Sequence, residues 1–122
     1  GIDIIEIHRV KRVFDSYGQR FLDRVFTLEE KRYCRGRAPQ LASRFAAKEA
    51  VMKLLGTGVR GVRWKDVEVT RQRGQAPKIV LHGTALARAE RIGLKQIALS
   101  LSHSNEFAVA SVVGESDKGN II

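Results

Sequence analysis

Cysteine, aromatic residues and long apolar runs are all scarce in this chain, and each scarcity excludes a class of protein. The single cysteine, Cys34, cannot form an internal disulfide, and no Cys or His cluster has the spacing of a zinc site. No apolar run approaches the ~20 residues that a membrane-spanning helix needs. The first residues, Gly-Ile-Asp, do not have the pattern of a signal peptide. We therefore expect a cytoplasmic protein.

Acidic residues are also few compared with basic ones. The 122 residues include 13 Asp and Glu against 22 Lys and Arg, which gives a formal net charge of +9. A hydrophobic content of 43% with 29% charged residues is typical of one folded domain. The excess of positive charge indicates an anionic partner: a nucleic acid, a phosphorylated small molecule, an acidic protein or a membrane surface. The alternative is that these charges only solvate the surface.

Hydrophobic periodicity is mainly helical in the first half of the chain and mainly alternating in the second half. Helical spacing predicts helices over 10–17, 27–34, 39–55 and 84–92 with a further apolar stripe at 21–26, and alternation predicts strands over 1–7, 67–70, 78–81, 97–103 and 107–113. Thr27 and Glu30 carry the capping-box pattern, and Pro39 suits a first helical turn. We expect an α+β fold with helices packed on a small antiparallel sheet. Residues 1–113 would form the domain, and 114–122 a loose polar tail.

The longest predicted helix, 39–55, has an apolar face and a polar flank. At ~100° per residue, the apolar face consists of Ala46, Ala47, Ala50, Val51, Leu54 and Leu55. Phe45, Glu49 and Lys53 follow one another along the flank at i, i+4 and i+8. In the alternative interpretation, Glu49 and Lys53 form only a solvated ion pair worth ~0.2–0.5 kcal/mol.

Two carboxylates far apart in the sequence suit a hard cation. Asp3 on the first strand and Glu49 on the helix could hold Mg²⁺, which typically takes one or two protein carboxylates together with water and phosphate oxygens. Lys53, one turn after Glu49, would then meet a phosphate. Further anion-binding groups would come from Arg44, Lys48 and the amides of residues 56–58. These residues alone predict a Mg²⁺-dependent enzyme acting on a phosphate compound, and they do not name the reaction.

The three histidines have no shared context. His103 closes a predicted strand, where a histidine is more often structural than catalytic, and His8 and His82 are interpreted as surface residues. No Ser-His-Asp or Cys-His arrangement is evident, since such a triad is recognised by its geometry.

Four groups of residues stand out by their order and spacing. They are Gly1-Ile2-Asp3-Ile4-Ile5-Glu6-Ile7, Thr27-Leu28-Glu29-Glu30, Arg44-Phe45-Ala46-Ala47-Lys48-Glu49-Ala50 with Lys53 and Gly56-Thr57-Gly58, and Leu99-Ser100-Leu101-Ser102-His103 with Phe107-Ala108-Val109-Ala110. Together they resemble the motifs of bacterial holo-[acyl-carrier-protein] synthases, the single-domain 4′-phosphopantetheinyl transferases. The resemblance implies transfer of 4′-phosphopantetheine from coenzyme A to a serine of apo-acyl carrier protein. Adenosine 3′,5′-bisphosphate would be released, and the reaction would support fatty acid biosynthesis.

The resemblance also implies roles for individual residues. Asp3 and Glu49 match the family's magnesium ligands, and Lys53 matches a lysine that stabilises charge on the leaving phosphate. The coenzyme A site would be lined by Arg44, Lys53, Gly56, Gly58, Ser102 and His103. The base that deprotonates the serine would be Glu49 or a metal-bound water or hydroxide. Asp3, Glu49 and Lys53 are thus the expected catalytic residues.

The resemblance also implies a partner for the positively charged surface, because acyl carrier proteins are small and acidic. The docking residues would be Arg9, Arg12, Arg20, Arg24 and Phe45. Small members of the family assemble as trimers with active sites between subunits, so a homotrimer is expected. The main alternative is a basic nucleic-acid-binding module without catalysis. That module would need a stacking surface, and aromatic residues make up only 7% of this chain.

Overall fold

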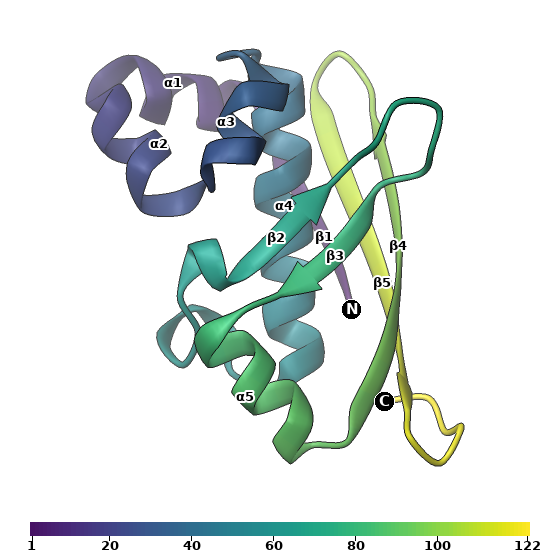
Figure 1. Ribbon diagram of the computed structural model, residues 1–122. Helices are drawn as coiled ribbons and strands as arrows, with labels where there is room; N and C mark the ends of the chain where they lie inside the picture. The colour runs from purple at the N-terminus through teal and green to yellow at the C-terminus, as the bar shows by residue number, and fades with distance from the viewer.

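A computed structural model describes residues 1–122, and Figure 1 shows its helices and strands. The first half contains β1 (Ile2–Glu6), α1 (Ile7–Tyr17), α2 (Gln19–Val25), α3 (Leu28–Cys34) and α4 (Ala38–Leu55). The second half contains the 3₁₀ turns η1 (Gly58–Arg60) and η2 (Trp64–Asp66), then β2 (Val67–Thr70), β3 (Lys78–Leu81), α5 (Gly83–Arg91), β4 (Leu94–His103) and β5 (Phe107–Ser116). The predicted α+β class is confirmed. None of the helices has the length and apolarity required to cross a membrane.

The strands form two antiparallel sheets that both pack against α4. The larger sheet has the order β1–β5–β4, and β2 pairs with β3 in the smaller one. Figure 1 shows α4 in the centre, the β2–β3 hairpin in front of it, and α1 to α3 grouped near its first turns. In the larger sheet, Asp3 lies opposite Ala110, which lies opposite Leu101. Strands from the two ends of the chain are therefore neighbours, and their pairing brings Asp3 against α4.

Helix α4 is buried nearly all round rather than along one stripe. Its predicted apolar face lies in the core, and the residues buried on its other faces include Ser43, Arg44, Lys48 and Met52. Pro39 lies in the first turn, where its missing N–H is not needed, and Gly56 ends the helix in the left-handed conformation with φ of 75°. Glu49 stays half-buried and Lys53 exposed, so the polar flank reaches the surface only in the second half of the helix.

Helix α3 begins with the predicted capping box. The Thr27 hydroxyl accepts a hydrogen bond from the Glu30 amide at 3.2 Å, and the Glu30 carboxylate accepts one from the Thr27 amide at 2.8 Å. The helix ends at Cys34 because the next two residues, Arg35 and Gly36, both have positive φ. A seven-residue helix is marginal by itself, so its contacts with α4 and β2 decide its stability.

The end of the chain differs from the sequence-based prediction. Strand β5 continues to Ser116, and Ile121 forms an isolated bridge with Glu115. The amide of Ile122 also donates to the carbonyl of Gly114 at 2.9 Å. The expected boundary at residue 113 therefore falls inside a strand, and the residues after it are not a loose tail. The prediction failed because the strand is continued by backbone hydrogen bonds with β4, which polar side chains do not reveal.

Candidate active site

Asp3, Glu49 and Lys53 come together where β1 packs on α4. The Lys53 Nζ donates to Oδ1 of Asp3 at 2.8 Å and to the backbone carbonyl of Ile2 at 3.1 Å. The Asp3 side chain is only 10% exposed, whereas that of Lys53 is 55% exposed. Glu49 lies one helical turn before Lys53 on the same face of α4. The structure thus places in one site the three residues that the motifs had singled out.

The two carboxylates of this site are close enough for their charges to interact. Burial raises the pKa of the Glu49 carboxyl, and the negative charge of Asp3 raises it further, against the opposing effects of Lys53 and Arg9. The hydrogen bond to Asp3 raises the pKa of the Lys53 ammonium. No hydrogen bond from the protein stabilises the ionised form of Glu49. A cation placed between Asp3 and Glu49 would relieve this repulsion.

These donors fit a magnesium ion that binds together with a phosphorylated substrate. Such an ion is typically held by one or two protein carboxylates, and water and substrate phosphates complete its octahedral shell. Asp3 and Glu49 would supply the two carboxylates, and Lys53 would lie beside the phosphate. The chain has no cluster of three or more His, Cys, Asp or Glu side chains that could enclose a metal alone.

The loop after α4 offers fewer free amides than its glycines suggest. The amide of Gly56 donates to the carbonyl of Lys53 at 3.1 Å, and the amide of Thr57 donates to that of Met52 at 3.2 Å. Gly56 therefore caps the helix, and its predicted part in anion binding through the amide is not supported. Gly58 opens η1 with φ of 57°, and a Cβ there would meet no atom within 4 Å. Open space remains beside the backbone of Gly58.

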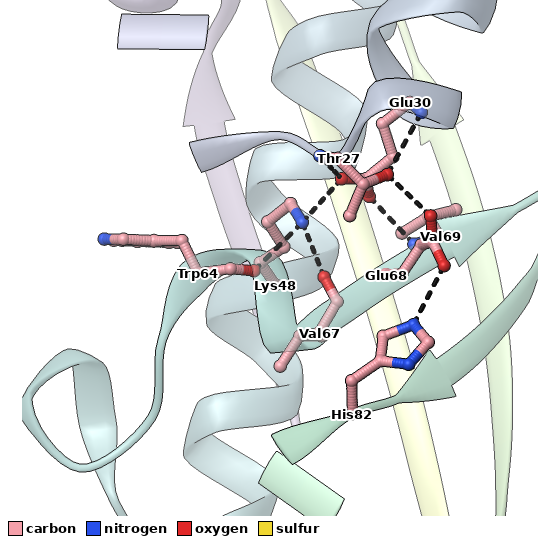
Figure 2. A network of polar contacts seen from close by, with 8 residues as sticks. All are labelled: Thr27, Glu30, Lys48, Trp64, Val67, Glu68, Val69 and His82. Atoms are coloured by element: carbon pink, nitrogen blue, oxygen red, sulfur yellow. Dashed lines mark hydrogen bonds and ion pairs between the residues drawn. The ribbon is translucent and has the colours of Figure 1, made fainter. Parts of the chain in front are cut away.

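Lys48 is not available to an anion, contrary to the prediction from the sequence. Its side chain is completely buried, and its Nζ donates to Oε1 of Glu30 at 2.8 Å and to the carbonyls of Trp64 and Val67. Figure 2 shows these contacts converging on the ammonium group, which has three donors in all. Burial lowers the pKa of Lys48, and the Glu30 carboxylate opposes this effect. The prediction failed because Lys48 faces α3 and β2 instead of solvent.

Glu30 is the centre of this buried network, although the sequence predicted it only as a capping residue. Its carboxylate also accepts a hydrogen bond from the amide of Val69 at 2.8 Å. The Thr27 hydroxyl donates to Glu68 at 2.6 Å, and Glu68 lies 2.9 Å from His82, so this exposed histidine has a partner after all (Figure 2). The available signal was a lysine inside an otherwise apolar helical stretch, which needs a buried counterion.

Arg44 is buried on a different side of α4. It is 5% exposed, and its guanidinium lies 4.2 Å from the centre of the Tyr33 ring, an arrangement typical of a cation–π contact. Five residues before Glu49, it is rotated by about 140° around the helix. Arg44 therefore lies on a different face of α4 from Glu49, and its expected part in binding coenzyme A stays a prediction.

Ser102 and His103 lie at the end of β4, away from the carboxylates of the same chain. His103 pairs with Ala108, which in turn pairs with Ile5 of β1. Two strand spacings and two residues along the strand separate His103 from Asp3, which is about 12 Å between Cα atoms. Because neighbouring side chains alternate, His103 points to the α4 side of the sheet and Ser102 to the open side. Within one chain, the predicted coenzyme-binding residues thus form two separate groups.

The predicted carrier-binding residues gather on α1, α2 and the adjoining side of α4. Arg9, Arg12, Arg20 and Arg24 are all exposed. A cavity of about 310 Å³ is lined by Val13, Tyr17, Arg20, Phe21 and Arg24. A second cavity of about 130 Å³ places Arg9 beside Phe45, whose ring stacks on Trp64 with 4.8 Å between ring centres. This surface combines positive charge with apolar cavities. The charge of Arg9 also acts on Glu49, whose pKa it lowers.

Nearly the whole chain is similar to proteins of one family. Residues 1–112 match the 4′-phosphopantetheinyl transferase superfamily. The holo-[acyl-carrier-protein] synthase of Koribacter versatilis is 47% identical over 119 residues, which cover 94% of this chain and 95% of that protein. The Helicobacter pylori enzyme in complex with coenzyme A has a TM-score of 0.85 and 28% identity over 94% of this chain and 98% of its own. The Neisseria meningitidis enzyme has a TM-score of 0.84 and 34% identity over 95% and 96%. The chain therefore belongs to the holo-[acyl-carrier-protein] synthase family.

Proposed function

We propose that this protein transfers 4′-phosphopantetheine from coenzyme A to a serine of an apo-acyl carrier protein. The observation that carries this proposal is the convergence of Asp3, Glu49 and Lys53 in a chain of this family. In the reaction, the serine oxygen attacks the phosphorus that bears the pantetheine, and the bond from that phosphorus to adenosine 3′,5′-bisphosphate breaks. The serine proton passes to a base. Such transfers depend on positioning and on stabilisation of negative charge.

Asp3 and Glu49 are the proposed magnesium ligands. When bound, Mg²⁺ would supply positive charge to the pyrophosphate and to the oxygen that leaves. The chain contributes two carboxylates whose mutual repulsion favours a cation. Glu49, with its raised pKa, is also the side chain best suited to accept the serine proton.

Lys53 is proposed to bind the pyrophosphate and to stabilise the charge of the leaving group. Its exposed ammonium can turn from Asp3 to a phosphate without moving the backbone. The open space beside Gly58 would accommodate the coenzyme next to it. Because His103 lies about 12 Å and Ser102 about 10 Å from Asp3 in the same chain, we place them in the site of a neighbouring subunit.

A homotrimer is part of this proposal. The face of the larger sheet turned away from α4 carries exposed apolar side chains, with Ile2 at 64%, Ile4 at 62% and Val113 at 48% exposure. Such a patch is typical of an interface between chains. Ile2 and Ile4 flank Asp3 on β1, so a contact there would bring a neighbour to the site. Light scattering should give three times the 13.6 kDa chain mass, and a fully active monomer would contradict the trimer.

The surface of α1 and α2 is the proposed docking site for the carrier protein. Its exposed arginines and apolar cavities are complementary to a small acidic partner. With coenzyme A and acyl carrier protein as substrates, we propose a role in fatty acid biosynthesis in the cytoplasm.

Intact-mass spectrometry of an apo-acyl carrier protein tests the reaction directly. Incubation with this protein, coenzyme A and Mg²⁺ should add the mass of one phosphopantetheine group, and EDTA should prevent the gain. Asp3→Ala and Glu49→Ala should each slow the transfer by about 10²- to 10³-fold, as expected when a charge-stabilising group is lost. No mass gain with folded protein would overturn the proposal, and retention of RNA or DNA would then have to be measured.

A further inference from the structure

Gly1 packs directly against the backbone of α4. A Cβ atom added to Gly1 would lie 2.5 Å from the carbonyl oxygen of Ala50 and 3.5 Å from the amide nitrogen of Leu54. Real Cβ atoms essentially never approach another heavy atom to less than 3.0 Å. Only glycine therefore fits between β1 and the helix at this point.

This contact adjoins the proposed metal site on both elements. Asp3 follows Gly1 by two residues, so both face the same side of the strand, towards α4. Ala50 directly follows Glu49 on the helix. Gly1 is also held in the sheet by two hydrogen bonds with the backbone of Val112, each 2.7 Å long. The approach of Gly1 to Ala50 thus sets how close Asp3 comes to Glu49.

The helix is the less movable of the two partners. Two residues before Ala50, Lys48 is tied to Glu30 and to the carbonyls of Trp64 and Val67, as Figure 2 shows. Strand β1, by contrast, lies at the edge of its sheet and pairs only with β5. A Cβ at Gly1 would therefore push β1 away from α4. Opening the contact from 2.5 to 3.0 Å requires a shift of at least 0.5 Å.

We infer that Gly1 is a positioning residue that holds Asp3 at working distance from Glu49 and Lys53. Catalytic groups must be held within about 0.5 Å of their productive geometry, and a misplacement of about 1 Å can cost about 10²-fold in rate. A single methyl group at Gly1 reaches this range without touching a functional side chain. The inference rests on the proposed Asp3–Glu49 metal site.

The test compares Gly1→Ala with Gly114→Ala. Gly114 lies in β5, and its added Cβ would approach Cδ1 of Leu94 to 2.7 Å and Cδ2 of Leu54 to 3.0 Å, which are the ends of flexible side chains. It therefore introduces a comparable crowding in the same sheet, away from Asp3. Binding of Mn²⁺ is measured by electron paramagnetic resonance with coenzyme A present, alongside kcat, the KM for carrier protein and thermal unfolding.

Gly1→Ala should weaken Mn²⁺ binding about tenfold and lower kcat by 10- to 100-fold, with an unchanged KM for carrier protein. Gly114→Ala should change each of these values less than twofold. Asp3→Glu, whose side chain is longer by about 1.5 Å, should weaken Mn²⁺ binding in the unaltered chain and partly restore it in Gly1→Ala. A role in folding alone predicts no such rescue.

Three results would overturn the inference: unchanged Mn²⁺ binding in folded Gly1→Ala, losses in both glycine variants in proportion to their lower unfolding temperatures, or a Gly1→Ala chain that does not fold. The variant Asp3→Ala distinguishes an error in the proposed role of Gly1 from an error in the proposed metal site. If Asp3→Ala leaves Mn²⁺ binding intact, the proposed metal site is wrong. If Asp3→Ala abolishes binding and Gly1→Ala does not alter it, only the role of Gly1 is wrong.

Discussion

Lys53 and Asp3 form an ion pair at 2.8 Å although fifty positions separate them in the chain. In this pair, the Lys53 ammonium engages Asp3, which is one of the two carboxylates proposed to hold magnesium. A metal ion bound there would compete with the Lys53 ammonium, and a phosphate bound with the metal would offer the ammonium a new partner. On this proposal the ion pair links metal binding to substrate binding.

Lys53→Met should consequently change metal binding and turnover in opposite directions. Loss of the ammonium frees Asp3, so Mn²⁺ should bind several-fold more tightly, whereas kcat should fall about 10²-fold because the leaving phosphate loses a cation. A Mn²⁺ titration and steady-state kinetics give the two values. Lys53→Arg keeps the charge and is the matched control. Weaker metal binding in Lys53→Met would contradict the proposed competition.

Glu49 should reduce the stability of the fold at neutral pH. Its pKa is raised above the ordinary value of 4.5, so the folded state holds this proton more tightly than the unfolded chain does. The stability it contributes is therefore complete below pH 4.5 and is lost as the pH rises through the higher folded pKa. Because the side chain is half-exposed, Glu49→Gln should raise Tm at pH 7 by only about 2 °C.

Scanning calorimetry of Glu49→Gln at pH 7 and at pH 3.5 tests this dependence. The two chains should unfold at equal temperatures at the lower pH. Glu90→Gln, on the exposed side of α5, is the control and should change neither value. A Tm difference that is the same at both pH values would exclude the titration of Glu49 as its cause.

The buried pair of Lys48 and Glu30 should be costly to break from either side. Lys48→Met leaves the Glu30 carboxylate without its cation and should lower the free energy of unfolding by about 3–5 kcal/mol. Glu30→Gln should be similarly harmful, and the double variant should lose less than the sum. Urea unfolding measures all three. Arg32→Met, which breaks an exposed pair with Glu29, should cost less than about 1 kcal/mol. Additive losses at Lys48 and Glu30 would show that the two are not coupled.

Charge reversal on α2 should weaken the binding of the carrier protein and leave the binding of coenzyme A unchanged. Arg20→Glu should raise the KM for carrier protein about tenfold and leave the KM for coenzyme A unchanged, because charged rims mainly steer encounter. Arg91→Glu, on α5, changes the net charge equally and should have little effect. Equal changes in both variants would mean that only the overall charge matters. Arg9→Glu should also alter kcat, since Arg9 acts on Glu49.

Local sequence patterns predicted the helices and strands of this fold better than they predicted which strands pair and which elements pack together. The capping box at Thr27, the two ends of α4 and the β2–β3 hairpin depend on neighbouring residues, and all were predicted. The pairing of β1 with β5 joins opposite ends of the chain, so no local pattern contains it. Asp3 and Glu49 were therefore joined by the chemistry that a hard cation needs and by the family resemblance, and not by a pattern that predicts their contact.

Lys48 shows why the remaining features could not be predicted. Helical periodicity tells which side chains share a face, but it does not tell whether a second layer covers that face. Here α3 and β2 cover it, and a lysine expected at the surface is completely buried. The contact of Gly1 with Ala50 is hidden for a similar reason, because it depends on a distance between two backbones.

The Glu30 carboxylate caps its own helix and also neutralises Lys48. Fraying of the first turn of α3 would release both partners at once and leave the buried Lys48 ammonium without its counterion. We therefore expect that helix α3, in spite of its seven residues, does not open as a separate unit. Its amide protons are expected to exchange with solvent only in the same rare openings that expose the middle of α4. Because one carboxylate both caps the helix and pairs with Lys48, we expect the cap of α3 to be lost only when the whole domain unfolds.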